Sequence, residues 1–157
     1  MHKAIWFVLV VFMLSLNANA GGGHHHDFPV GEMTKAQVLE NEDFGQNYQN
    51  YVVSELEASK VQSWGKNVRI DVFFGMWCHD SEREVPQLLK LLASEPGAKL
   101  NLYALDIKKS DPKGLAKANK VKYTPTVIVY QDDKEVGRII ERPQSSLVND
   151  IHAMLAK

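Results

Sequence analysis

The stretch VRIDVFFGMWCHDSERE, residues 68–84, joins two patterns that are typical of different secondary structures. Its opening residues are β-branched and aromatic, and the run is short, which favours a buried strand over a helix. Beyond Gly75, apolar residues recur at helical spacing as far as Leu92. We therefore expect a strand whose carboxyl end delivers Trp77 and Cys78 to the start of a helix.

The expected helix has a start signal and an interruption. Ser81 and Glu84 have the spacing of a capping box, so we expect the helix to begin at Asp80 or Ser81. Pro86 lies inside it, where a proline removes a backbone hydrogen bond and bends the axis. Because an interior proline costs about 3 kcal/mol, its reason has to come from tertiary structure.

Helix and strand patterns alternate along the rest of the chain. The order predicts an α/β fold with a mixed central β-sheet and helices on both faces. In such sheets ligands bind beyond the carboxyl ends of the strands, which is where we expect Cys78. A short initial strand fits either at 28–30 or at 33–39. The expected elements are a helix over 44–61, a strand over 99–105, a helix over 111–119 capped by Asp111, hairpin strands over 126–130 and 135–140, and a helix after Pro143.

The first twenty residues have the composition of a signal peptide. Lys3 precedes an apolar run over residues 4–16, and the small residues that follow end at Ala20, where we expect cleavage. The apolar run is shorter than the roughly 20 residues that span a bilayer, so we expect no stable membrane anchor after cleavage. The sequence therefore predicts an exported protein, periplasmic or secreted.

Residues 21–43 are expected to form a flexible segment, followed by one domain over residues 44–157. The segment contains three adjacent histidines, His24, His25 and His26, which could bind a transition metal weakly. Neighbouring histidines on a flexible segment lack the spacing and supporting hydrogen bonds of a folded metal site. We therefore expect no resident metal or other cofactor, and a metal-handling role remains a minor alternative.

Charge and cysteine content argue against a nucleic-acid-binding protein and against a domain held together by internal disulfides. The chain carries 18 basic and 19 acidic residues, a formal net charge of −1, which offers no attractive field for nucleic acid. Exported domains of this size are often held together by disulfides, but Cys78 is the single cysteine. An unpaired thiol in such a compartment is either buried and inert or exposed and reactive.

Three features resemble the thioredoxin superfamily over about residues 46–156. The segment from Trp77 to Ser81 follows an apolar strand, Pro86 lies five residues beyond Ser81, and a Thr-Pro-Thr segment opens a later strand. The resemblance implies a thioredoxin-like fold in which Cys78 takes the place of the nucleophilic cysteine and Pro86 that of the helix-kinking proline.

The resemblance also implies a peptide-binding groove. Pro125 would take the place of the cis-proline beside the thiol, and Thr124 would offer backbone groups to an extended substrate. Trp77 would form either a platform for that peptide or part of the core. The partners implied are cysteine-containing proteins and low-molecular-weight thiols such as glutathione.

Two departures from the family pattern bear on mechanism. Ser81 replaces the second cysteine of the C-x-x-C motif, so the sequence is C-x-x-S. The buried acid that many thioredoxins carry six residues before the nucleophile would fall at Val72. Asp71 is one position away and, by strand alternation, should face the opposite side of the sheet.

A single thiol can carry out part of thiol-disulfide exchange. A helix start favours the thiolate of Cys78, a protonated His79 would favour it further, and Asp80 would oppose it. Ser81 could donate a hydrogen bond to the thiolate but cannot displace a substrate. We therefore expect a monothiol oxidoreductase or isomerase, with a disulfide-linked dimer through Cys78 as a further outcome. The alternative is a non-catalytic module that keeps the peptide groove.

Overall fold

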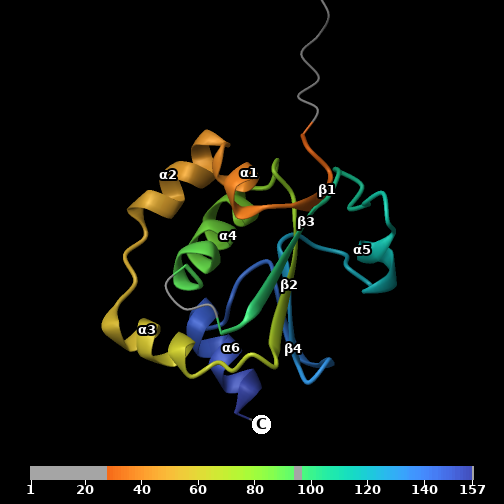
Figure 1. The fold of residues 1–157 in the computed structure, drawn as a ribbon. Helices are drawn as coiled ribbons and strands as arrows, with labels where there is room; N and C mark the ends of the chain where they lie inside the picture. The colour runs from red at the N-terminus through yellow and green to blue at the C-terminus, as the bar shows by residue number, and fades with distance from the viewer. Residues whose placement is uncertain (1–27, 94–96, 157) are drawn as a thin grey trace, which may run out of the picture.

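The computed structural model describes residues 28–93 and 97–156 (Figure 1). The predicted signal peptide and the three histidines lie outside these ranges. The described residues contain five strands in one mixed sheet of order β1-β3-β2-β4-β5, in which β2 and β3 are parallel and the other neighbours antiparallel. The strands are β1 (Gly31–Met33), β2 (Val68–Phe74), β3 (Lys99–Ala104), β4 (Thr126–Gln131) and β5 (Lys134–Ile140).

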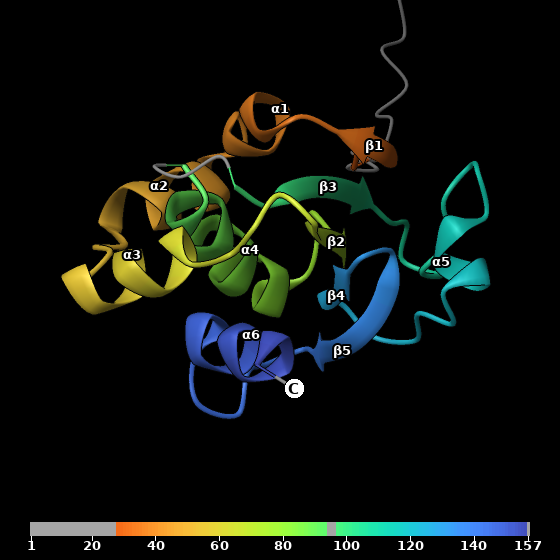
Figure 2. The same ribbon diagram turned by 60° about the horizontal axis from the view of Figure 1, so that its bottom comes forward.

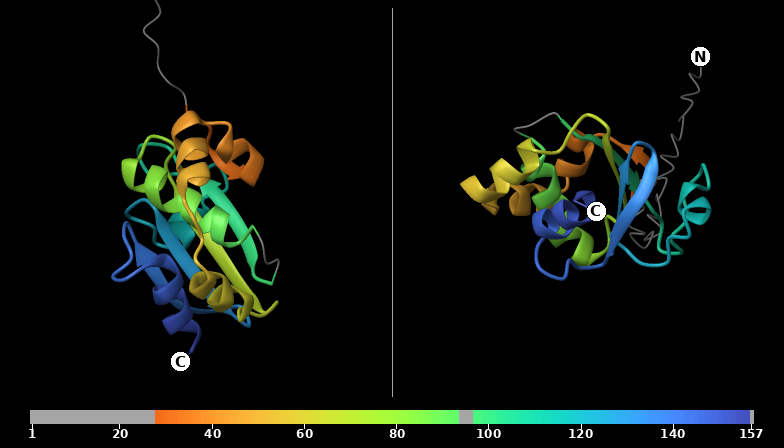
Figure 3. Two further views of the ribbon diagram at one scale, coloured as in Figure 1. Left: turned by 90° about the vertical axis from the view of Figure 1, so that its left-hand side faces the viewer. Right: turned by 90° about the horizontal axis from the view of Figure 1, so that it is seen from below.

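Helices cover both faces of this sheet, as the sequence predicted. The helices α2 (Glu42–Asn50), α3 (Glu55–Gln62), α4 (His79–Leu91) and α6 (Leu147–Leu155) lie on one side, and α5 (Leu115–Ala118) lies on the other (Figures 2 and 3). The short helix α1 (Lys35–Leu39) contacts α2. Within the described ranges, no helix has both the length and the apolar character needed to cross a membrane.

Strand alternation divides the core into two clusters. Ile70, Val72 and Phe74 of β2 face the larger cluster, together with side chains from α2, α3, α4 and α6. Phe73 points to the opposite face, where it packs with residues of the α5 side such as Ala116. Asp71 alternates with Val72 and so lies on that opposite face, as predicted, where it accepts hydrogen bonds from neighbouring polar side chains.

The folded part begins earlier than the predicted boundary at residue 44. Strand β1 pairs with β3, and α1 places Val38 in the larger core with no exposed surface. Thr34 caps α1 through a capping box with Gln37. The short strand predicted at 28–30 or 33–39 lies instead at 31–33, and residues 35–39 form a helix. Elements this short give weak sequence patterns, and their neighbours β3 and α2 hold them in place.

The single helix predicted over residues 44–61 is instead two helices, α2 and α3. Tyr51 ends α2 with an extended backbone, and Ser54 caps α3. Ser54 Oγ accepts from the Glu57 amide at 3.3 Å, while Glu57 accepts from the Ser54 amide at 2.9 Å. This capping box satisfies amides that a continuous helix would have bonded internally, and therefore marks a new start.

The predicted helix over 111–119 is also shorter than expected. Asp111 does act as a cap, because its carboxylate accepts from the amides of Lys113, Leu115 and Ala116. The α-helical turn itself starts only after Gly114, whose φ of 69° lies in the left-handed region. The predictions for β2, β3, the β4–β5 hairpin and α6 are confirmed to within one or two residues.

Candidate active site around Cys78

Cys78 lies where β2 has ended and α4 begins. It is the N-cap residue of α4, with extended backbone angles of φ −106° and ψ 118°, and it is half-buried. Its thiol Sγ donates to the Thr124 carbonyl at 3.2 Å. The Thr124–Pro125 peptide bond is cis, as the resemblance implied. The fold thus brings together Cys78 and the Thr124–Pro125 segment that precedes β4.

Trp77 is held beside the thiol by two contacts. Its indole Nε1 donates to the Leu105 carbonyl at 3.0 Å, and the Lys109 ammonium lies 5.3 Å from the ring centroid. The ring also covers Gly75 so closely that a Cβ there would lie 2.6 Å from a ring carbon. Trp77 therefore shields the turn after β2 while remaining partly exposed beside Cys78.

Ser81 has a different position from the one predicted. Its side chain is fully buried, and its Oγ accepts from the Gly75 amide at 3.2 Å. The prediction that Ser81 forms a capping box with Glu84 is wrong, because Cys78 is the cap residue and Ser81 belongs to the first turn of α4. The thiol of Cys78 instead bonds to Thr124. The Ser81 oxygen thus holds the turn after β2.

His79 is exposed and paired within its own helix. Its Nδ1 lies 2.9 Å from the Glu82 carboxylate, and the imidazole side chain is 96 % exposed. The hydrogen bond to Glu82, together with the charge of that carboxylate, raises the pKa of His79. The protonated form that would favour a neighbouring thiolate is therefore populated over a wider pH range.

Asp80 is clamped by two arginines. Its Oδ1 accepts from Arg83 Nη2 at 2.8 Å and from Arg142, whose Nε and Nη2 lie 3.2 Å and 3.1 Å away. Partial burial alone would raise the pKa of Asp80, but the Arg83 hydrogen bond and the Arg142 charge outweigh it and lower that pKa. The expected opposition of Asp80 to a thiolate is thus offset by positive charge.

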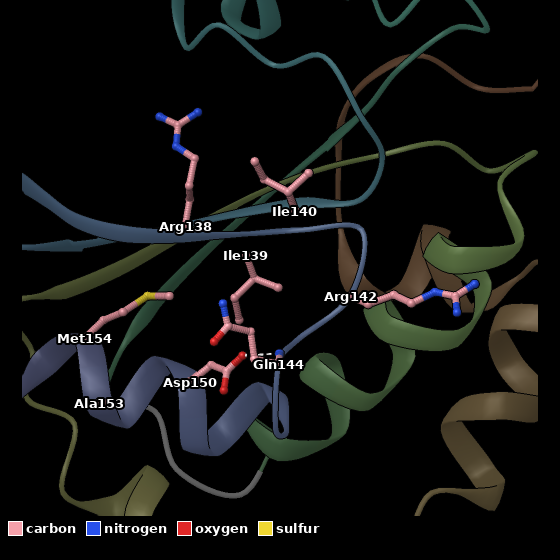
Figure 4. Close-up of a pocket in the computed structure, with 8 residues that line it drawn as sticks. All are labelled: Arg138, Ile139, Ile140, Arg142, Gln144, Asp150, Ala153 and Met154. Carbon is pink, nitrogen blue, oxygen red and sulfur yellow. Dashed lines mark hydrogen bonds between the residues drawn. The ribbon is translucent and has the colours of Figure 1, made fainter.

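Arg142 was not among the residues predicted from the sequence. It lies between β5 and α6, 62 residues after its partner Asp80. Figure 4 shows its side chain extending toward α4, at the rim of a hollow of about 440 Å³ that also contacts Asp150 and Met154. No motif connects an arginine in this loop to the Cys78 helix, so only the fold reveals the contact.

The described residues of the site have the parts of a thiol centre. Within residues 28–93 and 97–156, no three His, Cys, Asp or Glu side chains are arranged to hold a metal ion. What the arrangement offers is one partly exposed thiol at a helix start, a carbonyl acceptor beside it, and an indole at its edge. Of the residues predicted for the site, Trp77, Cys78, Thr124 and Pro125 are brought together, while Ser81 is turned inward.

Comparison with known proteins agrees with this geometry. The thioredoxin family model matches residues 29–151. The chain belongs to the thioredoxin family. A curated relative, the thiol-disulfide oxidoreductase ResA of Bacillus thuringiensis, is 27 % identical over 124 residues, which cover 76 % of this chain and 69 % of the relative.

Two solved structures show the same fold at low identity. A protein of unknown function from Pseudomonas aeruginosa is 18 % identical, with a TM-score of 0.62 over 82 % of this chain and 94 % of its own. An HIV epitope-scaffold is 17 % identical, with a TM-score of 0.64 over 80 % of this chain and 93 % of its own. Both likenesses concern the thioredoxin fold alone.

Proposed function

We propose that this thioredoxin-family protein is an exported thiol-disulfide exchange protein whose single nucleophile is Cys78. The observation that carries the proposal is the half-buried thiol at the N-cap of α4, 3.2 Å from the Thr124 carbonyl. Unpaired amides at a helix start favour negative charge, so this position suits a thiolate. Similarity to a thiol-disulfide oxidoreductase supports the same chemistry.

The proposed reaction begins when the Cys78 thiolate attacks one sulfur of a substrate disulfide. A bond forms between Cys78 and that sulfur, the substrate's S–S bond breaks, and the second sulfur leaves as a thiolate. The electron count balances because one disulfide is exchanged for another. Trp77, Thr124 and Pro125 would bind the peptide around the attacked sulfur, with the Thr124 carbonyl available once the thiol proton is gone.

Release then requires a thiol from elsewhere. Ser81 cannot supply it, since its hydroxyl is a poor nucleophile toward sulfur and is buried against Gly75. A second cysteine of the substrate or a glutathione-like thiol attacks the mixed disulfide, and Cys78 departs as the leaving thiolate. This favours isomerisation or monothiol exchange on cysteine-containing proteins and low-molecular-weight disulfides over net reduction.

Alkylation and trapping test the proposal directly. We expect the Cys78 thiol of the folded protein to react with iodoacetamide at pH 7 faster than free glutathione does. We also expect the protein isolated without reductant to carry a disulfide-linked adduct that intact mass spectrometry identifies. Cys78→Ala controls for non-specific labelling. A folded-state rate slower than that of glutathione, with no adduct, would count against the proposal.

Ser81 also permits a second candidate, a peptide-binding module that has lost turnover. The observation in its favour is the absence of a resolving thiol at the buried position 81. Restoring that thiol separates the two candidates. If the rest of the exchange machinery is intact, Ser81→Cys gains net disulfide reductase activity with a dithiol reductant, whereas Ser81→Ala does not. If Ser81→Cys stays inactive and Cys78→Ala still captures every partner, the binding module is correct.

Export is the remaining component of the proposal, and it is supported by the leader-like composition of the first twenty residues. Cleavage after Ala20 gives a mature chain that begins at Gly21. We expect N-terminal sequencing of the protein from its native compartment to give Gly-Gly-Gly-His. A chain that retains Met1 in the cytoplasmic fraction would contradict export.

A further inference from the structure

We propose that Arg142 is a positioning residue of the Cys78 site, which holds Asp80 at the first turn of α4 and cancels its negative charge beside the thiol. The inference deepens the proposed function and rests on it, because it concerns the reactivity of Cys78. It assigns a role to the loop between β5 and α6, which carries none of the motif residues.

The contacts on Asp80 are concentrated on one oxygen. Oδ1 accepts a hydrogen bond from Arg83 Nη2 at 2.8 Å and one from Arg142 Nε at 3.2 Å, and it lies 3.1 Å from Arg142 Nη2. Arg83 belongs to α4 itself, whereas Arg142 reaches across from another element, as Figure 4 shows. Arg83 also pairs with Glu84, so the connected groups Asp80, Glu84, Arg83 and Arg142 have a formal charge of zero, which loss of Arg142 would make negative. The cluster begins two residues after Cys78.

The loop that carries Arg142 is fixed against the same segment that contacts the thiol. The Glu141 amide donates to the Pro125 carbonyl at 2.7 Å, and the Arg142 amide donates to the Ile140 carbonyl at 2.7 Å. Glu141 has a φ of 60°, so the chain turns sharply there. The position of Arg142 is therefore set by the strand that follows Pro125.

Asp80 and Arg142 act within a mixed set of charges. On α4, His79 pairs with Glu82, and Arg83 also donates to Glu84. The adjoining loops contribute Lys109 above Trp77, Lys122 and Tyr123 before Thr124, and Glu141 beside Arg142. Within this set, Asp80 is contacted by two arginines, one from α4 and one from the loop after β5. Arg142 lies outside the core, so its removal changes the net charge at Asp80 without disturbing core packing.

Removing the positive charge of Arg142 and the negative charge of Asp80 in separate variants tests the inference. The measurement is the rate of Cys78 alkylation by iodoacetamide from pH 5 to 10. Iodoacetamide is uncharged, so charge changes alter the thiolate population and not the approach of the reagent. An exposed charge pair has an effect of about two- to fivefold. We expect Arg142→Gln to slow alkylation at pH 7 by about that factor, and Asp80→Asn to accelerate it similarly.

The double variant gives the decisive comparison. Asp80→Asn with Arg142→Gln restores the formal charge of the wild-type cluster, so its rate should return to near the wild-type value. Arg142→Lys keeps the charge and should also stay near wild type. Lys134→Gln is the matched control, since it removes the same charge at the far end of β5, about 20 Å along the strand and beyond the screening length of about 10 Å. Its rate should not change.

Each other outcome overturns the inference. Arg142→Gln at the wild-type rate would show that Arg142 has no influence on the thiol. Arg142→Lys as slow as Arg142→Gln, or a double variant as slow as Arg142→Gln, would show a structural role without charge compensation. Circular dichroism confirms that each variant is folded. If wild-type Cys78 reacts more slowly than glutathione, the proposed function itself is wrong. If wild-type Cys78 is reactive but its rate does not depend on Arg142, only the present inference is wrong.

Discussion

The orientation of Trp77 depends on the missing side chain of Gly75. A Cβ at this position would lie 2.6 Å from one ring carbon of Trp77 and 2.9 Å from its Nε1, the atom that donates to Leu105. Gly75→Ala therefore has to displace the indole and break that hydrogen bond. We expect a loss of about 1–3 kcal/mol in the free energy of unfolding, measured by urea denaturation.

Fluorescence can locate the effect of Gly75→Ala at the indole. In a Trp64→Phe background, Trp77 is the single tryptophan of residues 28–156, and we expect Gly75→Ala to shift its emission to longer wavelength. Gly114→Ala is the matched control. Its added Cβ would meet nothing within 4 Å, although its φ of 69° adds backbone strain. An unchanged Trp77 spectrum in Gly75→Ala would show that the ring tolerates the methyl group in place.

The His79–Glu82 pair predicts a pH dependence of defined sign. The Glu82 hydrogen bond raises the pKa of His79 above its ordinary value of about 6.5. A raised folded-state pKa means that the pair's stabilisation is complete below about pH 6.5 and is lost as the pH rises through the folded-state value. We expect the His79 imidazole resonance to titrate above pH 6.5 in the wild type and closer to 6.5 in Glu82→Gln. Glu135→Gln, which removes a carboxylate paired elsewhere, should leave it unchanged.

Single residues differ in how far the sequence could place them. Trp77, Cys78 and Pro125 carry local signals, because a strand, a helix start and a Thr-Pro-Thr segment fix their order and spacing. The inward turn of Ser81 toward Gly75 depends on how β2 meets α4, which spacing alone does not specify. The Arg142 contact depends on tertiary structure entirely, since the β4–β5 hairpin has to bring its loop back to α4.

At the level of elements, the break between α2 and α3 is set by a cap rather than by a helix-breaking residue. Ser54 Oγ accepts from the Glu57 amide, and the Glu57 carboxylate accepts from the Ser54 amide. Ser54→Ala should cost about 1 kcal/mol in the free energy of unfolding, the usual value for a lost cap. Chemical denaturation measures it, with exposed Ser110→Ala as a control expected within about 0.5 kcal/mol of wild type. A loss no larger than that of Ser110→Ala would show that helix packing alone holds the break.

The predicted and observed elements differ chiefly at their boundaries. A short β-branched and aromatic run identified β2, which is buried on both faces, and apolar spacing identified β3 and α6, each of which has a face against the core. Boundaries failed where side-chain capping decides them. The Ser-x-x-Glu pattern marks a helix start at Ser54, whereas the same pattern at Ser81 falls on a buried residue inside α4. Burial distinguishes a true cap from an accidental match, and the sequence pattern does not contain it.

For the whole molecule, the sheet determines where the single thiol lies. Parallel β2 and β3 end at the same edge, so Cys78 lies beyond the sheet with Trp77 bonded to the chain just after β3. The chain has a single cysteine, and it is partly exposed. Any disulfide that it forms therefore joins two molecules, and the fold determines which partners can reach it.

A second copy of the chain is the simplest such partner. When purified protein is oxidised with diamide, two Cys78 thiols give up their protons and one electron each, diamide is reduced to its hydrazine, and a Cys78–Cys78 disulfide forms. We expect intact mass spectrometry without reductant to show twice the mass of the monomer, with a dimer fraction that rises with protein concentration. When excess glutathione is present during the oxidation, diamide instead couples one Cys78 thiol with one glutathione thiol, so we expect a monomer carrying one glutathione. Dithiothreitol should reverse both products. Cys78→Ala should remain monomeric throughout. A wild-type chain that stays unmodified and monomeric in diamide would mean that Trp77 and the Thr124–Pro125 segment shield the sulfur from a macromolecule and a tripeptide alike.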